Sequence, residues 1–311
     1  MTHLPPAIFL MGPTASGKTG VAVELLQTLP VELISVDSAL VYRDMNIGTA
    51  KPDAATLKLA PHHLINIITP TMSYSAATFR NDALRLMADI TARGKIPLLV
   101  GGTMLYFRAL QNGLSDLPVA DPAVRAELDR MIAECGIVKL HEQLANVDAE
   151  TAQRLDPNDT QRIQRAMEIY LLTGTPMSKL LKHKPEHTLP YRVTNIALLP
   201  SDRAVLHRRI ATRFGQMIEQ GLVDEVRGLR ARYELHPDMP SMRCVGYRQA
   251  WQFIDGEINE AQLFETGLAA TRQLAKRQLT WLRSTPDVIP IDCLSANLTQ
   301  QVCNAVKEAR I

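Results

Sequence analysis

An eight-residue glycine loop near the N-terminus narrows the choice of fold more than any other segment. Residues 12–19 read Gly-Pro-Thr-Ala-Ser-Gly-Lys-Thr and match the pattern GxxxxGK[ST]. The apolar run Ala7–Met11 comes directly before the loop, and a helical pattern from Lys18 to about Leu29 follows it. Between a strand and a helix, the backbone N–H groups of such a loop point into a concavity at a helix N-terminus and bind phosphate oxygens. The loop therefore predicts a site for a di- or triphosphate.

The side chains of the loop support this interpretation. Lys18 adds a mobile positive charge, and the hydroxyl of Thr19 is placed to bind magnesium. We expect the phosphates to be bound by Gly12, Pro13, Thr14, Ala15, Ser16, Gly17, Lys18 and Thr19.

Strand and helix patterns alternate along most of the chain. Strand-like runs are expected at 7–11, 31–36, 96–100, 193–199 and 288–291, with a possible strand at 64–68. Helical spacing is expected at 73–93, 202–233, 246–255 and 259–284. Alternation of this kind predicts an α/β fold, with a parallel sheet like that of P-loop proteins.

The strand pattern is absent between residues 117 and 190. Helices are expected there at 121–135 and 159–172, and this segment is net acidic, whereas both flanks are net basic. We therefore predict a P-loop core domain of residues 1–116 and 191–311, interrupted by an all-helical insertion domain, 117–190.

Composition excludes several classes of protein. With 46% hydrophobic residues the chain can build a full core, which excludes wholesale disorder. No apolar run reaches about 18 residues, and residues 1–6 lack the basic segment of a signal peptide, so we expect a soluble, cytoplasmic protein. The four cysteines contain no CxxC pair, which leaves a zinc site unsupported. A net charge of +2 neither demands nor forbids a polyanionic partner.

The sequence lacks the other motifs of a nucleotide hydrolase. Gly-Gly-Thr-Met follows the strand at 96–100, where a metal-holding aspartate would be expected, and no Asn-Lys-x-Asp signature is present. The acidic residue at a strand end is instead Asp37. Because the carboxyl ends of such strands line the ligand crevice, we expect Asp37 to face the loop as a general base or an outer metal ligand. Capping of a following helix is the alternative.

Several motifs together resemble one family. Residues 35–42 read Ser-Val-Asp-Ser-Ala-Leu-Val-Tyr, 47–52 read Ile-Gly-Thr-Ala-Lys-Pro, and 100–106 read Val-Gly-Gly-Thr-Met-Leu-Tyr. Further matches are Pro-His-His-Leu at 61–64, Gln-Arg-Ile-Gln-Arg at 161–165, Met-Arg-Cys-Val-Gly-Tyr-Arg at 242–248 and Lys-Arg-Gln-Leu-Thr-Trp-Leu-Arg at 276–283. With the glycine loop, this set spans nearly the whole chain and resembles the bacterial tRNA dimethylallyltransferases (tRNA isopentenyltransferases).

The resemblance implies a reaction and its cofactor. Dimethylallyl diphosphate would alkylate N6 of the adenosine 3′-adjacent to the anticodon (position 37 of the tRNA), with release of pyrophosphate and with Mg²⁺ as cofactor. Asp37 would act as the base, and Arg213 resembles an arginine that the family places on the diphosphate; a solvated helix face is its alternative. Thr103, at a strand end, would bind the flipped nucleotide, unless it only caps the next helix.

The partners implied are dimethylallyl diphosphate and the anticodon stem-loop of tRNA, bound by a monomer with no membrane contact. On the helix at 272–283, Arg272, Lys276 and Arg283 share one face, which is typical of a phosphate-binding stripe. The target base must leave its stack, and we expect the helical insertion to close over the loop and exclude water. The residues expected to contact tRNA are Asp37, Ser38, Ala39, Leu40, Thr103, Arg125, Gln161, Arg162, Ile163, Gln164, Arg165, Arg243, Cys244, Val245, Gly246, Tyr247, Arg248, Lys276, Arg277, Gln278, Leu279, Thr280, Trp281, Leu282 and Arg283.

Three other functions fit part of the sequence. A nucleotide or nucleoside kinase explains the loop and a helical lid, but not the basic C-terminal third. An isopentenyltransferase for free adenine nucleotides needs the loop and Asp37 but not the RNA-facing segments. A non-enzymatic RNA-binding module needs neither the loop nor Asp37. His62 and His63 are expected to point to opposite sides of an extended strand, which argues against a metal site.

Overall fold

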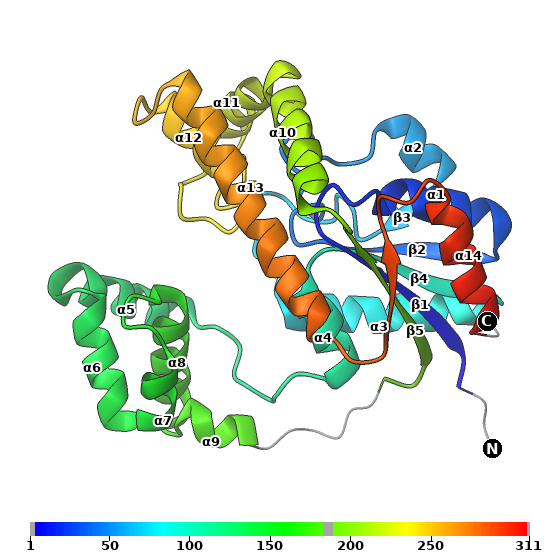
Figure 1. Cartoon of the computed structure of the whole chain (residues 1–311). Coiled ribbons are helices and arrows are strands. Elements are labelled where there is room, and N and C mark those ends of the chain that lie inside the picture. The colour runs from blue at the N-terminus through cyan, green and yellow to red at the C-terminus, as the bar shows by residue number, and fades with distance from the viewer. Residues whose placement is uncertain (1–3, 183–188, 310–311) are drawn as a thin grey trace. The chain divides into compact units, whose positions relative to one another are not determined.

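The computed structural model describes residues 4–182 and 189–309. The chain forms two compact units, drawn in Figure 1. The first comprises Met1–Leu110 and Pro190–Ile311, and the second comprises Gln111–Leu189. In the described part of the chain, no helix is long and apolar enough to cross a membrane.

The first unit is built on a parallel sheet, which confirms the expected α/β fold class. Its strands have the spatial order β3-β2-β4-β1-β5-β6, and every pairing is parallel. Their bounds are β1 Pro6–Met11, β2 Val31–Val36, β3 His62–His63, β4 Ile96–Gly101, β5 Arg192–Leu199 and β6 Val288–Asp292. The central strands are buried on both faces, as parallel sheets require.

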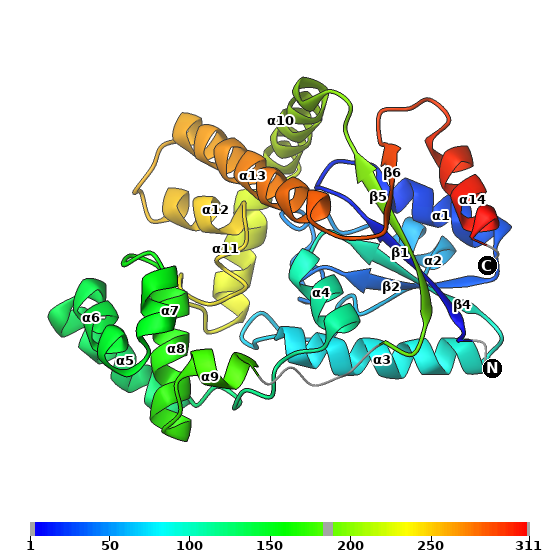
Figure 2. The same cartoon turned by 60° about the horizontal axis from the view of Figure 1, so that its bottom comes forward.

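Helices cover both faces of this sheet (Figures 1 and 2). On one face, α1 (Lys18–Thr28) and α14 (Leu298–Glu308) pack in a cluster that includes Ile8 and Leu10 of β1. On the other, α3 (Ala76–Ala92) and α4 (Met104–Asn112) pack around aromatic rings, with Phe9 5.2 Å from Phe107. The alternation of these β1 side chains holds the three layers together.

One expected strand is placed differently. The possible strand at 64–68 is not formed, and the pairing residues are instead His62 and His63 of β3. Leu64 and Asn66 have φ of 65° and 57°, which interrupts the extended backbone. Only an isolated bridge from Ile68 to Tyr42 remains.

A second group of helices surrounds its own apolar core. It comprises α10 (Arg203–Glu219), α11 (Leu222–Arg232), α12 (Tyr247–Ile254) and α13 (Glu260–Arg283). The short helix α2 (Ala54–Leu59) contributes no residue to this core. Tyr247 is fully buried in this core, and its hydroxyl donates to Oε1 of Glu225 at 2.5 Å. The same carboxylate accepts hydrogen bonds from the backbone N–H groups of residues 46–48 at 2.8–3.3 Å. Glu225 thus fixes the loop after β2 to α11.

The second unit has helices and no strand among its described residues. Its helices are α5 (Pro122–Cys135), α6 (Ile137–Val147), α7 (Ala149–Arg154), α8 (Thr160–Thr173) and α9 (Met177–Lys182). Asp121 caps α5 and Asp159 caps α8. Leu128, Leu140, Leu144 and Ile163 form its core.

Candidate functional site

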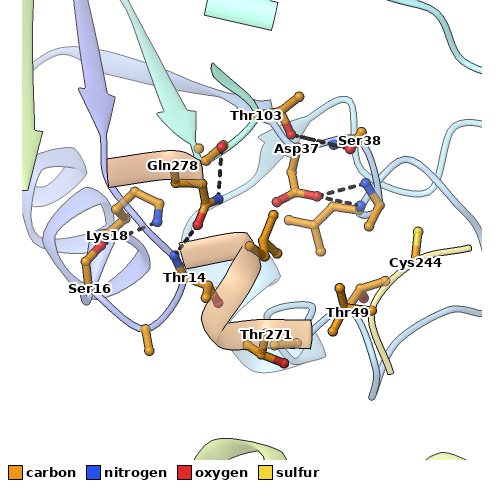
Figure 3. Close-up of a pocket in the computed structure, with 18 of the residues that line it drawn as sticks. Thr14, Ser16, Lys18, Asp37, Ser38, Thr49, Thr103, Cys244, Thr271 and Gln278 are labelled. Atoms are coloured by element: carbon orange, nitrogen blue, oxygen red, sulfur yellow. Dashed lines mark hydrogen bonds between the residues drawn. The ribbon is translucent and has the colours of Figure 1, made fainter. Parts of the chain in front are cut away.

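A cavity of about 1020 Å³ lies at the carboxyl ends of β1, β2 and β4. Residues 14–19 of the glycine loop line it, together with the segments after β2 and β4. Helices α10 and α13 and the loop at 240–245 contribute the remaining walls. Figure 3 shows that Lys18, Asp37 and Thr103 reach this space from different elements of the first unit.

The glycine loop has the geometry of a phosphate loop. Gly17 has φ of 86° and Ala15 has φ of 62°, so two left-handed residues turn the chain from β1 into the start of α1. Nζ of Lys18 donates to the carbonyl oxygens of Gly12 and Pro13 at 2.9 and 2.6 Å. Lys18 therefore lies along the loop at the first turn of α1.

Burial lowers the pKa of Lys18 to about 8. The Asp37 carboxylate opposes this change, while the Arg213 guanidinium adds to it. Burial also lowers the pKa of Arg213, against the influence of Asp37. These three groups, from α1, the end of β2 and α10, therefore share one electrostatic environment.

Asp37 is held by a turn rather than by a helix. Its Oδ1 accepts from the backbone N–H groups of Ala39 and Leu40 at 2.8 and 3.3 Å. Among the described residues, no group donates to its other oxygen, and Asp37 lines the cavity. Oγ1 of Thr103 accepts from the N–H of Ser38 at 3.0 Å, which brings the ends of β2 and β4 together. Asp37 thus has one oxygen bound to the backbone and one that accepts no hydrogen bond from the described residues.

Several residues that line the cavity were not predicted as site residues, and three of them are polar or basic groups close to the predicted ones. Arg209 lies one turn before Arg213 on α10 and donates to the Cys293 carbonyl at 3.3 Å. Its i,i+4 spacing from Arg213 is a signal that could have identified it. His62 also lines the cavity, and burial lowers its pKa. Gln216 lines it as well, from the exposed part of α10.

The tRNA candidates of the first unit fall into three groups. Ser38, Ala39, Leu40, Thr103, Arg243, Cys244, Val245, Arg277, Gln278 and Trp281 line the cavity. Arg248, Lys276, Thr280 and Arg283 are exposed, whereas Gly246, Tyr247, Leu279 and Leu282 are buried. The Arg108 guanidinium lies 5.6 Å from the centroid of the Trp281 ring. The exposed basic groups leave the RNA interpretation open, while the buried apolar side chains belong to the core.

In the second unit the candidate arginines have partners. Arg125 and Arg165 both bind the carboxylate of Glu168, which is fully buried. The amide of Gln164 donates to Asp129, and Arg162 pairs with Asp159. Ile163 is buried in the core, whereas Arg125, Gln161 and Arg162 are exposed. Within the described residues, no cluster of three His, Cys, Asp or Glu side chains could hold a metal.

Comparison with known proteins gives concordant matches. A family model described as IPP transferase matches residues 40–285. Over 303 residues the chain is 61% identical to the tRNA dimethylallyltransferase of Methylobacillus flagellatus, covering 97% of this chain and 96% of that protein. The tRNA isopentenylpyrophosphate transferase of Bacillus halodurans has a similar crystal structure, with a TM-score of 0.70, 35% identity and 98% coverage of both chains. A eukaryotic dimethylallyltransferase described as acting on tRNA superposes with a TM-score of 0.78 at 27% identity, covering 98% of this chain and 77% of that one.

Proposed function

This chain belongs to the IPP transferase family, and from that premise we propose how its cavity acts. The chain is a prenyl-transferring enzyme that modifies tRNA. The dimethylallyl group moves from dimethylallyl diphosphate to N6 of the adenosine on the 3′ side of the anticodon. The bond from the allylic carbon to the diphosphate oxygen breaks, the bond from N6 to that carbon forms, and N6 loses one proton.

The phosphate loop would bind the leaving diphosphate. Negative charge grows on the bridging oxygen as the carbon–oxygen bond breaks, so fixed positive groups lower the barrier. The N–H groups at the start of α1, Lys18 and Arg213 supply such groups on one side of the cavity. Arg209 adds a further cation in the same wall.

The residues around the loop fit a magnesium ion. Thr19 presents an exposed hydroxyl to the cavity. The hydroxyl of Ser35 also lines the cavity, is buried and has no partner, so it can bind a water molecule of a hydrated ion. Thr19 would hold the ion directly, with Ser35 behind it. Bound magnesium would neutralise charge on the diphosphate.

Asp37 would act as the general base. The adenine amine is a poor nucleophile because its lone pair is delocalised into the ring, so proton removal as the N–C bond forms lowers the barrier. A positioned base contributes about 10²–10⁴-fold. The Ala39 and Leu40 amides orient one carboxylate oxygen, which leaves the other for the proton.

The same proposal assigns the surfaces that would meet RNA. The exposed Lys276 and Arg277 of α13 would bind backbone phosphates. We assign the core domain to residues 1–116 and 191–311, and we assign tRNA contact and exclusion of water to the insertion, 117–190. Thr103, at the end of β4, would bind the flipped nucleotide. The enzyme would work as a monomer in the cytoplasm.

One observation carries the proposed mechanism: the phosphate loop, Asp37 and Arg213 line a single cavity in a member of this family. The test is transfer of label from radiolabelled dimethylallyl diphosphate, with magnesium, to unmodified tRNA, to free AMP or to no acceptor. Label on tRNA alone is the expected result. Label on AMP would assign the free-nucleotide activity instead, and ATP-dependent phosphoryl transfer without prenyl transfer would assign a kinase.

A further inference from the structure

Gln278 of α13 joins two loops of the cavity that are far apart in the sequence. Its Oε1 accepts from the N–H of Thr14 at 2.9 Å, and its Nε2 donates to the carbonyl of Gly102 at 2.9 Å (Figure 3). An N–H can only donate and a carbonyl can only accept, so this orientation of the amide is the one that satisfies both. Gln278 is 9% exposed, whereas the adjacent Lys276 and Arg277 are exposed. Its amide is therefore used inside the protein.

The space around this amide is closely fitted. A Cβ atom on Gly102 would lie 2.3 Å from Nε2 of Gln278 and 3.3 Å from the Gly12 carbonyl oxygen. A side chain at position 102 would therefore displace the amide. The absence of a side chain at Gly102 allows α13, the phosphate loop and the end of β4 to meet at one point.

The contact at Gly102 continues to Asp37 through the next residue. The N–H of Thr103 donates to the Val36 carbonyl at 3.2 Å, and its Oγ1 accepts from the N–H of Ser38 at 3.0 Å. Val36 and Ser38 flank Asp37 on both sides. The backbone that carries the proposed base is therefore attached to the backbone after β4, which Gln278 attaches to the phosphate loop.

We propose that Gln278 is a positioning residue that sets the placement of the phosphate loop relative to Asp37. It does not touch the reacting atoms, since both ends of its amide are bound to backbone. The carbon to be attacked is attached to the diphosphate in the loop, and the proton to be removed is near Asp37. The distance between the phosphate loop and Asp37 therefore decides whether the reacting groups align. This role rests on the proposed function. It assigns Gln278 to the support of the active site rather than to the surface that would bind RNA.

The first test replaces Gln278 with leucine, which keeps the volume and removes both hydrogen bonds. A displacement of about 1 Å in an active site can cost about 10²-fold, so we expect kcat to fall by about that factor. Affinity for tRNA, measured by filter binding without dimethylallyl diphosphate, should change by less than about 2-fold. Gln273→Leu is the matched control, because Gln273 is exposed on the same helix and is expected to leave kcat unchanged.

The second test, Gln278→Glu, remains informative if the leucine variant fails to fold. A protonated glutamic acid can still accept from Thr14 and donate to Gly102, but its ionised form repels that carbonyl. Burial raises the pKa of a carboxyl group. The ratio of variant to wild-type kcat should therefore rise as the pH falls from about 9 to about 6, whereas a merely structural loss gives a constant ratio.

The results separate this inference from the function on which it rests. If the wild-type enzyme transfers no label to tRNA, the proposed function fails. If it does transfer label, and either Gln278→Leu retains wild-type kcat or the Gln278→Glu ratio is independent of pH, the positioning role is overturned. A loss of tRNA affinity as large as the loss of kcat would also overturn it, because Gln278 would then bind RNA directly.

Discussion

Replacing Asp37 with asparagine separates its two roles in the turn and in the reaction. Oδ1 of Asp37 accepts from the Ala39 and Leu40 amides, and asparagine keeps an oxygen that can do the same. The second oxygen becomes an amide nitrogen, which cannot take a proton from N6 of adenine. The turn is therefore preserved while the base is removed.

The expected magnitudes differ for the two roles. Two charge-assisted hydrogen bonds become neutral ones, which should lower the free energy of unfolding by about 1 kcal/mol. Loss of the base should slow the chemical step by about 10²–10⁴-fold, or about 3–5 kcal/mol in the activation barrier. A large loss of rate with a small loss of stability is thus the signature of a base.

The assay is single-turnover transfer of labelled dimethylallyl to tRNA, with tRNA affinity measured in parallel. Asp53→Asn is the matched control, because Asp53 also accepts from a backbone amide, that of Thr56 at 2.7 Å, but does not line the cavity. A rate for Asp37→Asn within about 3-fold of wild type would reject the base role. So would a loss of tRNA affinity comparable to the loss of rate.

Three further predictions follow from groups in and around the cavity. Since the pKa of Lys18 is lowered to about 8, the side chain loses its charge as the pH rises through that value. Calorimetry should therefore show that the affinity for pyrophosphate falls by up to about 10-fold per pH unit above pH 8. Lys18→Arg should abolish this pH dependence, and a wild-type affinity that does not change with pH would contradict the prediction. Lys276→Ala with Arg277→Ala should weaken tRNA binding and reduce its salt dependence, and an unchanged salt slope would make this an ordinary solvated face. Glu225→Ala should lower the free energy of unfolding in urea by about 2–4 kcal/mol, because loop amides and a buried tyrosine hydroxyl lose their acceptor. The control Asp224→Ala, on the exposed face of α11, should lower it by less than about 0.5 kcal/mol. Equal losses for the two variants would be evidence that Glu225 does not fix the loop to α11.

Local patterns were sufficient for much of the fold. The glycine loop and the apolar strands at 7–11, 31–36 and 96–100 each depend on neighbouring residues, and the structure has them where the sequence predicts. The placement of Asp37 in the cavity also follows from a local signal, because it directly follows a buried strand.

Contacts between distant segments were not predictable from one sequence. Gln278 stands among basic residues on a helix that suits RNA, and only the packing of α13 shows that its amide faces the phosphate loop 264 residues away. Leu64 and Asn66 read as part of a strand, but tertiary contacts favour left-handed backbone there. The ion pair between Arg125 and Glu168 likewise depends on the packing of α5 against α8.

The strand order has a consequence for how the chain folds as it is synthesised. The neighbours β3-β2-β4-β1 are complete once Gly101 has been made, but β5 ends at Leu199, 98 residues later. At about 5–20 residues per second, β1 therefore remains an unpaired sheet edge for about 5–20 s after the ribosome adds Gly101. This edge carries Ile8, Phe9 and Leu10, all fully buried in the finished protein, and exposed apolar edges pair readily with other chains. An insertion between β4 and β5 thus lengthens the interval in which the nascent enzyme is open to aggregation and to chaperone binding.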